Sequence, residues 1–369
     1  MRVIKYVLGI VFPVIGIFLI VGAIISFALK GNSLIALVVG IIGVAFIVFF
    51  KNLRIKGRQE CDFDQYGNRK KQYSAMSQAE RKAIDMAVVA KNESIISEAE
   101  FNAMLHAGGK NPDKELAELI GLDKVKEQIE ELKAQMKYAD KKAIKNFHLV
   151  FLGNPGTGKT TVARIYTGFL YKYKYIKKNE YICTDASTLM ASGSSEKMRI
   201  ILNKAHGRVL FIDEAYALSY DASGLGQQIL AMLINEMENS RNNMIVIFAG
   251  YKESMRILFQ MNEGLSSRIN SFIFFEDYDH NELGAILTGM AKKDGYTIKQ
   301  NAYDHMVNIL LYKKCLPNFA NARTVRKLYE RTLQKHYLNL SKEVIDKEYK
   351  YALVDNDVVE DDAEDSYLG

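Results

Sequence analysis

Hydrophobic positions dominate the first fifty residues of this chain and are mixed with polar ones after that. Residues 7–29 form an uncharged apolar run of 23 residues, and residues 33–50 form a second run of 18. As helices, the two runs reach about 34 and 27 Å, which matches a bilayer core of about 30 Å. Because the connection Lys30-Gly31-Asn32 is very short, we expect a transmembrane helical hairpin over residues 1–56.

The charges that flank these runs predict an orientation. Lys30 lies at the turn, and the outer flanks carry Arg2, Lys5, Lys51, Arg54, Lys56 and Arg58. The positive-inside rule therefore places both ends, and the rest of the chain, in the cytosol. A cleaved signal peptide is the competing interpretation, but its apolar region is 7–15 residues long and no second run follows it. A buried helical hairpin is the other alternative.

Residues 57–112 are polar and mixed in charge, which is typical of a linker with short helices. Two capping boxes, Ser77 with Glu80 and Ser97 with Glu100, predict helices over 77–89 and 97–106. An adaptor or substrate-contact element is the alternative to a spacer. The glycine and proline residues at 108–112 predict the boundary with the next domain.

An alternation of helical and strand-type patterns begins after this linker. Apolar residues at helical spacing, Val125, Ile129, Leu132 and Met136, predict an amphipathic helix that starts at Asp123. Strand-type runs follow at 148–152, 181–184, 209–212, 245–249 and 272–275. This alternation predicts an α/β domain over 113–278, with a five-stranded parallel sheet covered by helices. Helical patterns alone follow, so we expect a small α-helical domain over 279–350 and an acidic tail over 351–369, disordered from Asp355 through Asp365.

A glycine-rich segment follows the first expected strand of this sheet. It reads Gly153-Asn154-Pro155-Gly156-Thr157-Gly158-Lys159-Thr160 and matches GxxxxGK[ST] between a strand and a helix. In such a phosphate loop the backbone N–H groups hold the phosphates, Lys159 reaches the β- and γ-phosphates and Thr160 ligates Mg²⁺. The expected cofactors are ATP and Mg²⁺. The expected nucleotide contacts are Asn154, Pro155, Gly156, Thr157, Gly158, Lys159, Thr160 and Thr161.

Two acidic residues end the apolar run at 209–212. Ligands of an open α/β sheet bind at the carboxyl ends of its strands, where Asp213 and Glu214 are expected. Asp213 is suited to hold Mg²⁺, directly or through water. Glu214 is suited to orient and deprotonate the attacking water, so the pair indicates hydrolysis as well as binding.

Several local motifs in a fixed order extend this pattern. They are Leu119-Ile120-Gly121-Leu122-Asp123, the phosphate loop, Phe211-Ile212-Asp213-Glu214-Ala215-Tyr216, Ala249-Gly250-Tyr251, Gly264-Leu265-Ser266-Ser267-Arg268 and Asn321-Ala322-Arg323-Thr324-Val325-Arg326. With them the chain resembles the AAA+ ATPases of the CbxX/CfqX group, which includes stage V sporulation protein K and the red-type rubisco activases. The resemblance covers about residues 115–337.

The resemblance implies roles for further residues. Ile120, Gly121 and Leu122 would cradle the adenine. Arg268 resembles the arginine finger that meets the γ-phosphate held by a neighbouring subunit, so the resemblance implies a ring, expected to be a hexamer. Arg323 resembles the sensor-2 arginine of the lid, and Arg326 is the weaker candidate for that role.

Two segments depart from the usual AAA+ pattern. Ala249-Gly250-Tyr251 offers no small polar sensor-1 residue after the fourth strand. The pore-loop region at 188–193 lacks the aromatic residue that grips a threaded polypeptide, although Leu189 and Met190 could act as weak grips. The sequence therefore supports ATP hydrolysis more strongly than threading.

Composition narrows the choice of partner and compartment. The net charge of +6 is modest, and half of it lies in the first 50 residues, so nucleic acid is not an expected partner. The Tyr171–Lys178 segment interleaves tyrosine with lysine; it could stack on bases or lie on anionic lipid, but a solvated helix end explains it more simply. The three cysteines lie far apart and form no CxxC pair, which speaks against a disulfide scaffold or zinc site.

Together these features predict a membrane-anchored AAA+ ATPase in a bacterial inner membrane, with its ATPase domain in the cytosol. The resemblance implies that it remodels or activates an unidentified protein client and does not degrade it, since no protease constellation follows the motor. A nucleotide-gated membrane scaffold with slow turnover and a nucleic-acid-stimulated motor are the alternatives.

Overall fold

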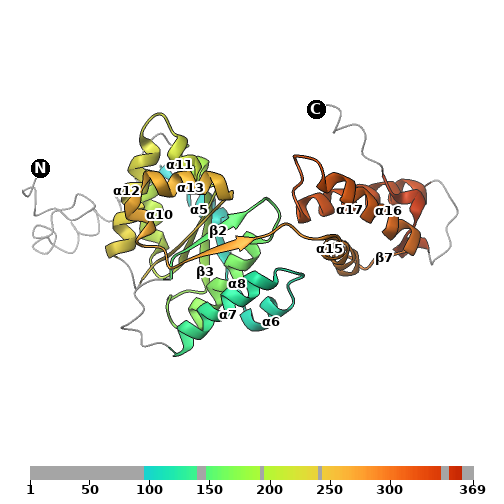
Figure 1. Ribbon diagram of the computed structural model, residues 1–369, viewed down its shortest axis with the longest axis horizontal. Coiled ribbons are helices and arrows are strands. Elements are labelled where there is room, and N and C mark those ends of the chain that lie inside the picture. The colour runs from blue at the N-terminus through green and yellow to red at the C-terminus, as the bar shows by residue number, and fades with distance from the viewer. Residues whose placement is uncertain (1–94, 139–146, 192–194, 240–242, 342–348, 360–369) are drawn as a thin grey trace, which may run out of the picture. The chain divides into compact units, whose positions relative to one another are not determined.

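The computed structural model describes residues 95–138, 147–191, 195–239, 243–341 and 349–359 (Figure 1). The chain divides into two units, 1–91 and 92–369, and all the described residues lie in the second. The predicted transmembrane hairpin and the helix expected at 77–89 therefore fall outside the described residues. Among the residues that the structure describes, no helix is long and apolar enough to cross a membrane.

A six-stranded sheet forms the centre of the ATPase domain. Its strands are β1 (Leu105–Ala107), β2 (Leu149–Gly153), β3 (Glu180–Asp185), β4 (Val209–Asp213), β5 (Ile245–Gly250) and β6 (Ser271–Phe275), in the spatial order β1-β3-β4-β5-β2-β6. The five predicted strands are confirmed and pair in parallel. The apolar runs of β2, β4 and β5 follow from burial of both sheet faces.

The prediction of a five-stranded sheet was short by one strand. β1 pairs antiparallel with β3 at the edge of the sheet, within the segment assigned to the linker. The helix expected at 97–106 is shorter, α5 (Glu98–Met104), and Ser97 caps it by accepting a hydrogen bond from the Glu100 N–H over 3.1 Å. A three-residue strand is too short to show alternation in the sequence, which explains the error.

Helices cover both faces of this sheet (Figure 1). α7 (Asp123–Tyr138) and α8 (Lys159–Lys172) pack on one face, where the four apolar residues predicted for α7 are buried. The opposite face packs against a second set: α9 (Ala186–Met190), α10 (Glu196–Ala205), α11 (Ala217–Tyr220), α12 (Leu225–Asn239), α13 (Lys252–Met261) and α14 (Glu263–Ser266). The short α6 (Pro112–Ala117) precedes α7.

The lid contains three long helices, α15 (His280–Lys293), α16 (Gln300–Lys314) and α17 (Ala322–Leu340). The expectation of helices alone was wrong, because β7 (Thr297–Ile298) pairs in parallel with β8 (Ala352–Leu353). Two 3₁₀ turns, η1 (Tyr349–Tyr351) and η2 (Asp355–Asp357), flank β8.

The prediction of disorder in the acidic tail was wrong for residues 355–359, and residues 351–354 also belong to the lid. Leu353 and Val358 are buried in the core of the lid. Asp357, also fully buried, accepts hydrogen bonds from His336 (2.9 Å) and Asn339 (2.8 Å) of α17. Acidic composition indicates a solvated tail on average, but this carboxylate is satisfied inside the fold.

Candidate active site

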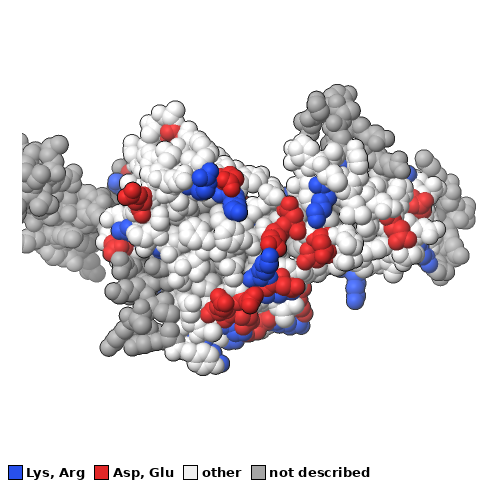
Figure 2. Space-filling model, viewed as in Figure 1, with Lys and Arg blue, Asp and Glu red and all other residues white. Residues whose placement is uncertain are grey.

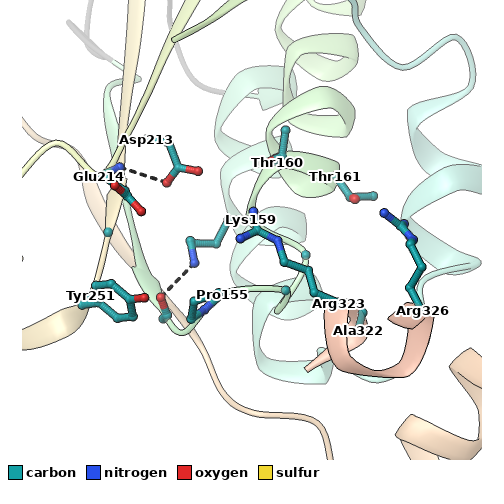
Figure 3. A pocket seen from close by; sticks show the side chains of 14 residues that line it. Pro155, Lys159, Thr160, Thr161, Asp213, Glu214, Tyr251, Ala322, Arg323 and Arg326 are labelled. Atoms are coloured by element: carbon teal, nitrogen blue, oxygen red, sulfur yellow. Dashed lines mark hydrogen bonds between the residues drawn. The ribbon is translucent and has the colours of Figure 1, made fainter. Parts of the chain in front are cut away.

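A cavity of about 270 Å³ lies at the carboxyl ends of β2, β4 and β5, facing the start of α17 (Figure 3). β5 lies between β2 and β4 in the sheet, so the loops that follow these strands meet at one edge. The cavity is lined by Gly153, Pro155, Gly156, Gly158, Lys159, Thr160, Thr161, Asp213, Glu214, Gly250, Tyr251, Ala322, Arg323 and Arg326. Motifs about 170 residues apart in sequence thus share one site.

The phosphate loop, residues 153–160, adopts the conformation that its glycines predict. Gly156 and Gly158 have φ values of +72° and +95°, which favour glycine. The side chains of Asn154 and Thr157 do not line the cavity: Asn154 bonds to Asp277, and the Thr157 hydroxyl donates to the Asn154 carbonyl over 2.8 Å. Pro155, Lys159, Thr160 and Thr161 line it as expected.

Lys159 points into the cavity from the first residue of α8. Its Nζ donates to the carbonyls of Gly153 (2.8 Å) and Asn154 (2.7 Å). Burial lowers the pKa of Lys159; the nearby Asp213 carboxylate opposes that shift and Arg323 adds to it. The Lys159 ammonium group is therefore weakly solvated and close to the Asp213 carboxylate and the Arg323 guanidinium. A poorly solvated cation in a phosphate loop is suited to bind a phosphate.

Asp213 and Glu214 occupy the end of β4, opposite the two arginines in Figure 3. The Glu214 N–H donates to Oδ1 of Asp213 over 3.0 Å, which fixes the aspartate carboxylate. Glu214 has φ +48°, a left-handed conformation that is uncommon for a residue with a side chain. The Ala215 N–H bonds to the Ala249 carbonyl over 3.0 Å and holds this turn against β5.

Arg323 and Arg326 both extend from the first turns of α17 toward the phosphate loop (Figure 3). Both line the cavity. The structure thus brings the expected sensor-2 arginine, Arg323, to the site, together with the weaker candidate, Arg326. Two lid cations facing Lys159 favour a highly charged anionic ligand.

Arg268 does not line this cavity. Its guanidinium forms an ion pair with Glu238 at 3.2 Å and donates to the Gly264 carbonyl over 2.6 Å. It lies between α14 and β6, so it cannot complete the site of its own chain in this arrangement.

The expected adenine cradle lies beside the site. Leu122 approaches Gly158, where an added Cβ would meet its Cδ1 at 3.3 Å. Gly121 has φ +58°, and a Cβ there would overlap the carboxylate of Glu282 on α15; Ile120 lies near Gly289 on the same helix. None of the three lines the cavity that holds Lys159, and their adenine contact stays a prediction.

Two tyrosines at the site were missed by sequence reasoning. Tyr251 lines the cavity at the sensor-1 position, where a small polar residue was sought. Tyr278 donates its hydroxyl to the Thr157 carbonyl over 3.3 Å, and burial raises the pKa of this phenol to about 12. The aromatic residue that follows Ala249-Gly250 was the available signal for Tyr251; nothing in the sequence distinguished Tyr278.

Two other sequence candidates have structural explanations. Leu189 is fully buried and Met190 partly buried against the same core, so the idea that Leu189 grips a polypeptide was wrong. In the Tyr171–Lys178 segment, Tyr173 and Tyr175 pack against the core and Lys172 pairs with Asp113 at 2.5 Å. On the face shown in Figure 2, acidic and basic groups interleave rather than forming one basic field.

The residues at the site fit a nucleotide bound with Mg²⁺. Thr160 offers a hydroxyl and Asp213 a carboxylate, and oxygen donors are the ligands that Mg²⁺ prefers. Within the described ranges, no group of three or more His, Cys, Asp or Glu residues could hold a metal by itself. Mg²⁺ is usually held by one or two protein oxygens together with substrate phosphates.

Comparison with known families agrees with this geometry. Residues 149–277 match the ATPase family associated with various cellular activities (AAA), and residues 279–366 match the AAA lid domain. The lid match extends beyond residue 350, in agreement with the ordered segment at 349–359. The crystal structure of the FIGL-1 AAA domain is similar at a TM-score of 0.54 and 19% identity, covering 75% of this chain and 92% of that chain, which supports the fold.

Two relatives indicate the group within this family. Protein CfxQ of Xanthobacter flavus is 36% identical over 234 residues, which cover 60% of this chain and 74% of that protein. The chloroplastic ribulose bisphosphate carboxylase/oxygenase activase of Cyanidioschyzon merolae is 36% identical over 226 residues, covering 58% and 77%. The chain is thus an ATP hydrolase that belongs to the CbxX/CfxQ/CbbX, rubisco-activase-like group of AAA+ ATPases.

Proposed function

We propose that this ATPase is anchored in a membrane and uses ATP hydrolysis to remodel or activate a protein partner complex. One observation carries the proposal: the cavity combines Lys159, Asp213 and Glu214 of the sheet domain with Arg323 and Arg326 of the lid. A change in the phosphate groups would therefore alter contacts with both domains at once. The name of the Cyanidioschyzon relative, an activase, supports a partner-directed role.

In the proposed reaction, Lys159 binds the β- and γ-phosphates and Arg323 senses the γ-phosphate from the lid. Glu214 accepts a proton from the attacking water, and the bond from its N–H keeps the neighbouring Asp213 carboxylate oriented. Mg²⁺, held by Thr160 and Asp213, would neutralise the charge that develops on the phosphates. Loss of the γ-phosphate then releases the lid arginines and moves the lid.

A ring, most simply a hexamer, completes the proposal. Arg268 lies outside the cavity of its own chain, which supports its action on the site of a neighbouring subunit. An arginine supplied in this way stabilises transition-state charge. Ring assembly would then be a condition for turnover, and a client could act by stabilising the ring.

The membrane anchor rests on the two apolar runs at 7–29 and 33–50, which are long enough to span a bilayer. The charges that flank the two runs favour a cytosolic ATPase domain, and the membrane we propose is a bacterial inner membrane. Fractionation of cells that express the full chain, or a chain lacking residues 1–56, is the test. We expect the full chain in the membrane fraction after a carbonate wash, and release of both proteins into the supernatant would contradict the anchor.

The partner is best identified by trapping. Glu214→Gln should bind ATP without hydrolysing it, so its pull-down from solubilised membranes should retain stalled client proteins. Lys159→Ala, which should not hold ATP, is the control. Equal recovery of the same proteins by both variants would contradict ATP-dependent remodelling. Very slow, client-independent turnover with nucleotide-dependent assembly would favour a scaffold instead.

A further inference from the structure

Asn321, the residue before α17, has an unusual side-chain arrangement. It is fully buried and adopts φ +49° and ψ −126°. An asparagine in this position ordinarily accepts a hydrogen bond from the first turn of its own helix. Here the side chain makes no such cap bond, so it is available for contacts outside the lid.

These contacts reach the ATPase domain. Nδ2 of Asn321 donates to Oδ1 of Asp277 over 2.7 Å and to the Pro155 carbonyl over 3.3 Å. Its Oδ1 accepts the Tyr278 N–H over 3.0 Å. Asp277 and Tyr278 belong to residues 276–279, which join β6 to α15 and so connect the two domains.

Asp277 extends the same network to the phosphate loop. Nδ2 of Asn154 lies 3.0 Å from each oxygen of the Asp277 carboxylate. Asn154, Asp277 and Asn321, here named the hinge cluster, therefore join the phosphate loop, the interdomain connection and the lid. A backbone bond from the Ala322 N–H to the Gly156 carbonyl, at 3.2 Å, reinforces the junction.

We propose that the hinge cluster sets the position of Arg323 over the phosphate loop, with Asn321 as the positioning residue. Asn321 lies two residues before Arg323, and its carbonyl accepts the Val325 N–H of the first helical turn over 3.1 Å. Rotation of the lid away from the loop must break the bond from Asn321 to the Pro155 carbonyl, and it must also break one of the two links of Asp277, to Asn321 or to Asn154. The inference concerns ATP binding and does not depend on which partner the enzyme acts on.

A double-mutant cycle tests this position-setting role. The full chain carries Glu214→Gln so that ATP is retained, and its Kd for ATP is measured by calorimetry. Asn321→Gly suits the backbone conformation, which glycine adopts readily, and removes the amide. We expect the Kd to rise about tenfold, since bonds to a charged group are lost. Arg323→Ala should then raise the Kd for ATP by a much smaller factor in the Asn321→Gly background than it does alone. If Arg323→Ala raises the Kd for ATP by the same factor in both backgrounds, the proposal is overturned.

An exchange of side chains gives a second test. Asn321→Asp places two carboxylates together and should weaken ATP binding by about tenfold or more. Adding Asp277→Asn restores an amide–carboxylate pair, so the double variant should recover most of the affinity. A double variant that folds but binds no better than Asn321→Asp would overturn the proposal. If Asn321→Asp does not fold, the cycle with Asn321→Gly decides.

The lid offers a matched control for damage to its fold. Asn339 donates to Oδ1 of Asp357 over 2.8 Å, an equivalent amide–carboxylate pair remote from the cavity lining. Asn339→Asp should lower the stability of the lid and leave the Kd for ATP unchanged. A rise in Kd equal to that of Asn321→Asp would show that lid damage alone explains the effect, and would overturn the proposal.

Discussion

Arg268 is held by Glu238, with 3.2 Å between Nη2 and Oε2, at a place that does not line the cavity containing Lys159. The pair is partly exposed, with 24% and 42% of the two side chains accessible, so its contribution to stability is small, about 1 kcal/mol or less. An arginine whose structural value is small can still be essential if a second subunit needs it. We therefore expect that substitution of Arg268 lowers activity strongly and stability only slightly.

Arg268→Ala tests that separation. We expect a loss of stability of about 1 kcal/mol in urea unfolding, and a fall in kcat of about 10³-fold, the smaller of the effects typical of a trans-acting arginine. Mixing provides the control. Arg268→Ala subunits retain Glu214, and Glu214→Gln subunits retain Arg268, so mixed rings contain some complete sites. If mixtures assemble but recover no hydrolysis at any ratio, the shared site is wrong.

The pH dependence of nucleotide binding should report on Lys159. Its pKa lies below that of an ordinary lysine because it is buried. ATP affinity is therefore expected to be full below this pKa and to weaken as pH rises through it. Arg323→Ala removes a positive charge and should move the midpoint to higher pH; Asp213→Asn should move it lower. Calorimetric titration of ATP across alkaline pH measures the midpoint.

Arg326 supplies the comparison for this experiment. It lines the same cavity but is not among the main charges that shift the pKa of Lys159. Arg326→Ala should change the affinity for ATP without moving the midpoint. A midpoint that shifts equally in the Arg323 and Arg326 variants would contradict the charge assignment.

The segment at 349–358 should contribute measurably to lid stability. Asp357 is fully buried and satisfies several donors, so Asp357→Ala should cost about 3 kcal/mol because those donors lose their acceptor. Asp355 pairs with His305 at 2.8 Å on the surface, and Asp355→Ala should cost about 1 kcal/mol or less. Urea unfolding of both variants gives the comparison. Equal losses would mean that Asp357 does not hold this segment.

Much of the ATPase domain could be predicted because its signals are local. β4 and β5 are buried on both faces and therefore read as uninterrupted apolar runs, at 209–212 and 245–249. The conformation of the phosphate loop is predictable because its glycines favour positive φ, as at Gly158 with φ +95°. Asp213 and Glu214 lie at the carboxyl end of β4, and Lys159 follows β2 after the phosphate loop, so the sequence predicted that they meet in one cavity.

The features that were missed depend on contacts between distant segments. β1 is three residues long and exists because it pairs with β3. Asp357 is buried because His336 and Asn339, some twenty residues earlier, supply its donors. Asn321 begins a motif that the sequence shows, but no local pattern indicates the bond from its amide to Asp277. Such partners follow from tertiary packing, which no local pattern encodes.

Single-turnover hydrolysis by the full chain carrying Glu214→Gln is the decisive measurement. ATP, Mg²⁺ and excess enzyme are mixed, and bound ATP and ADP are followed by rapid quench. We expect ATP to bind with near wild-type affinity and to be hydrolysed about 10²-fold or more slowly, because the proton acceptor is lost. Lys159→Ala should instead lose binding. Hydrolysis by Glu214→Gln at the wild-type rate would contradict the assignment of this cavity as the site of ATP hydrolysis.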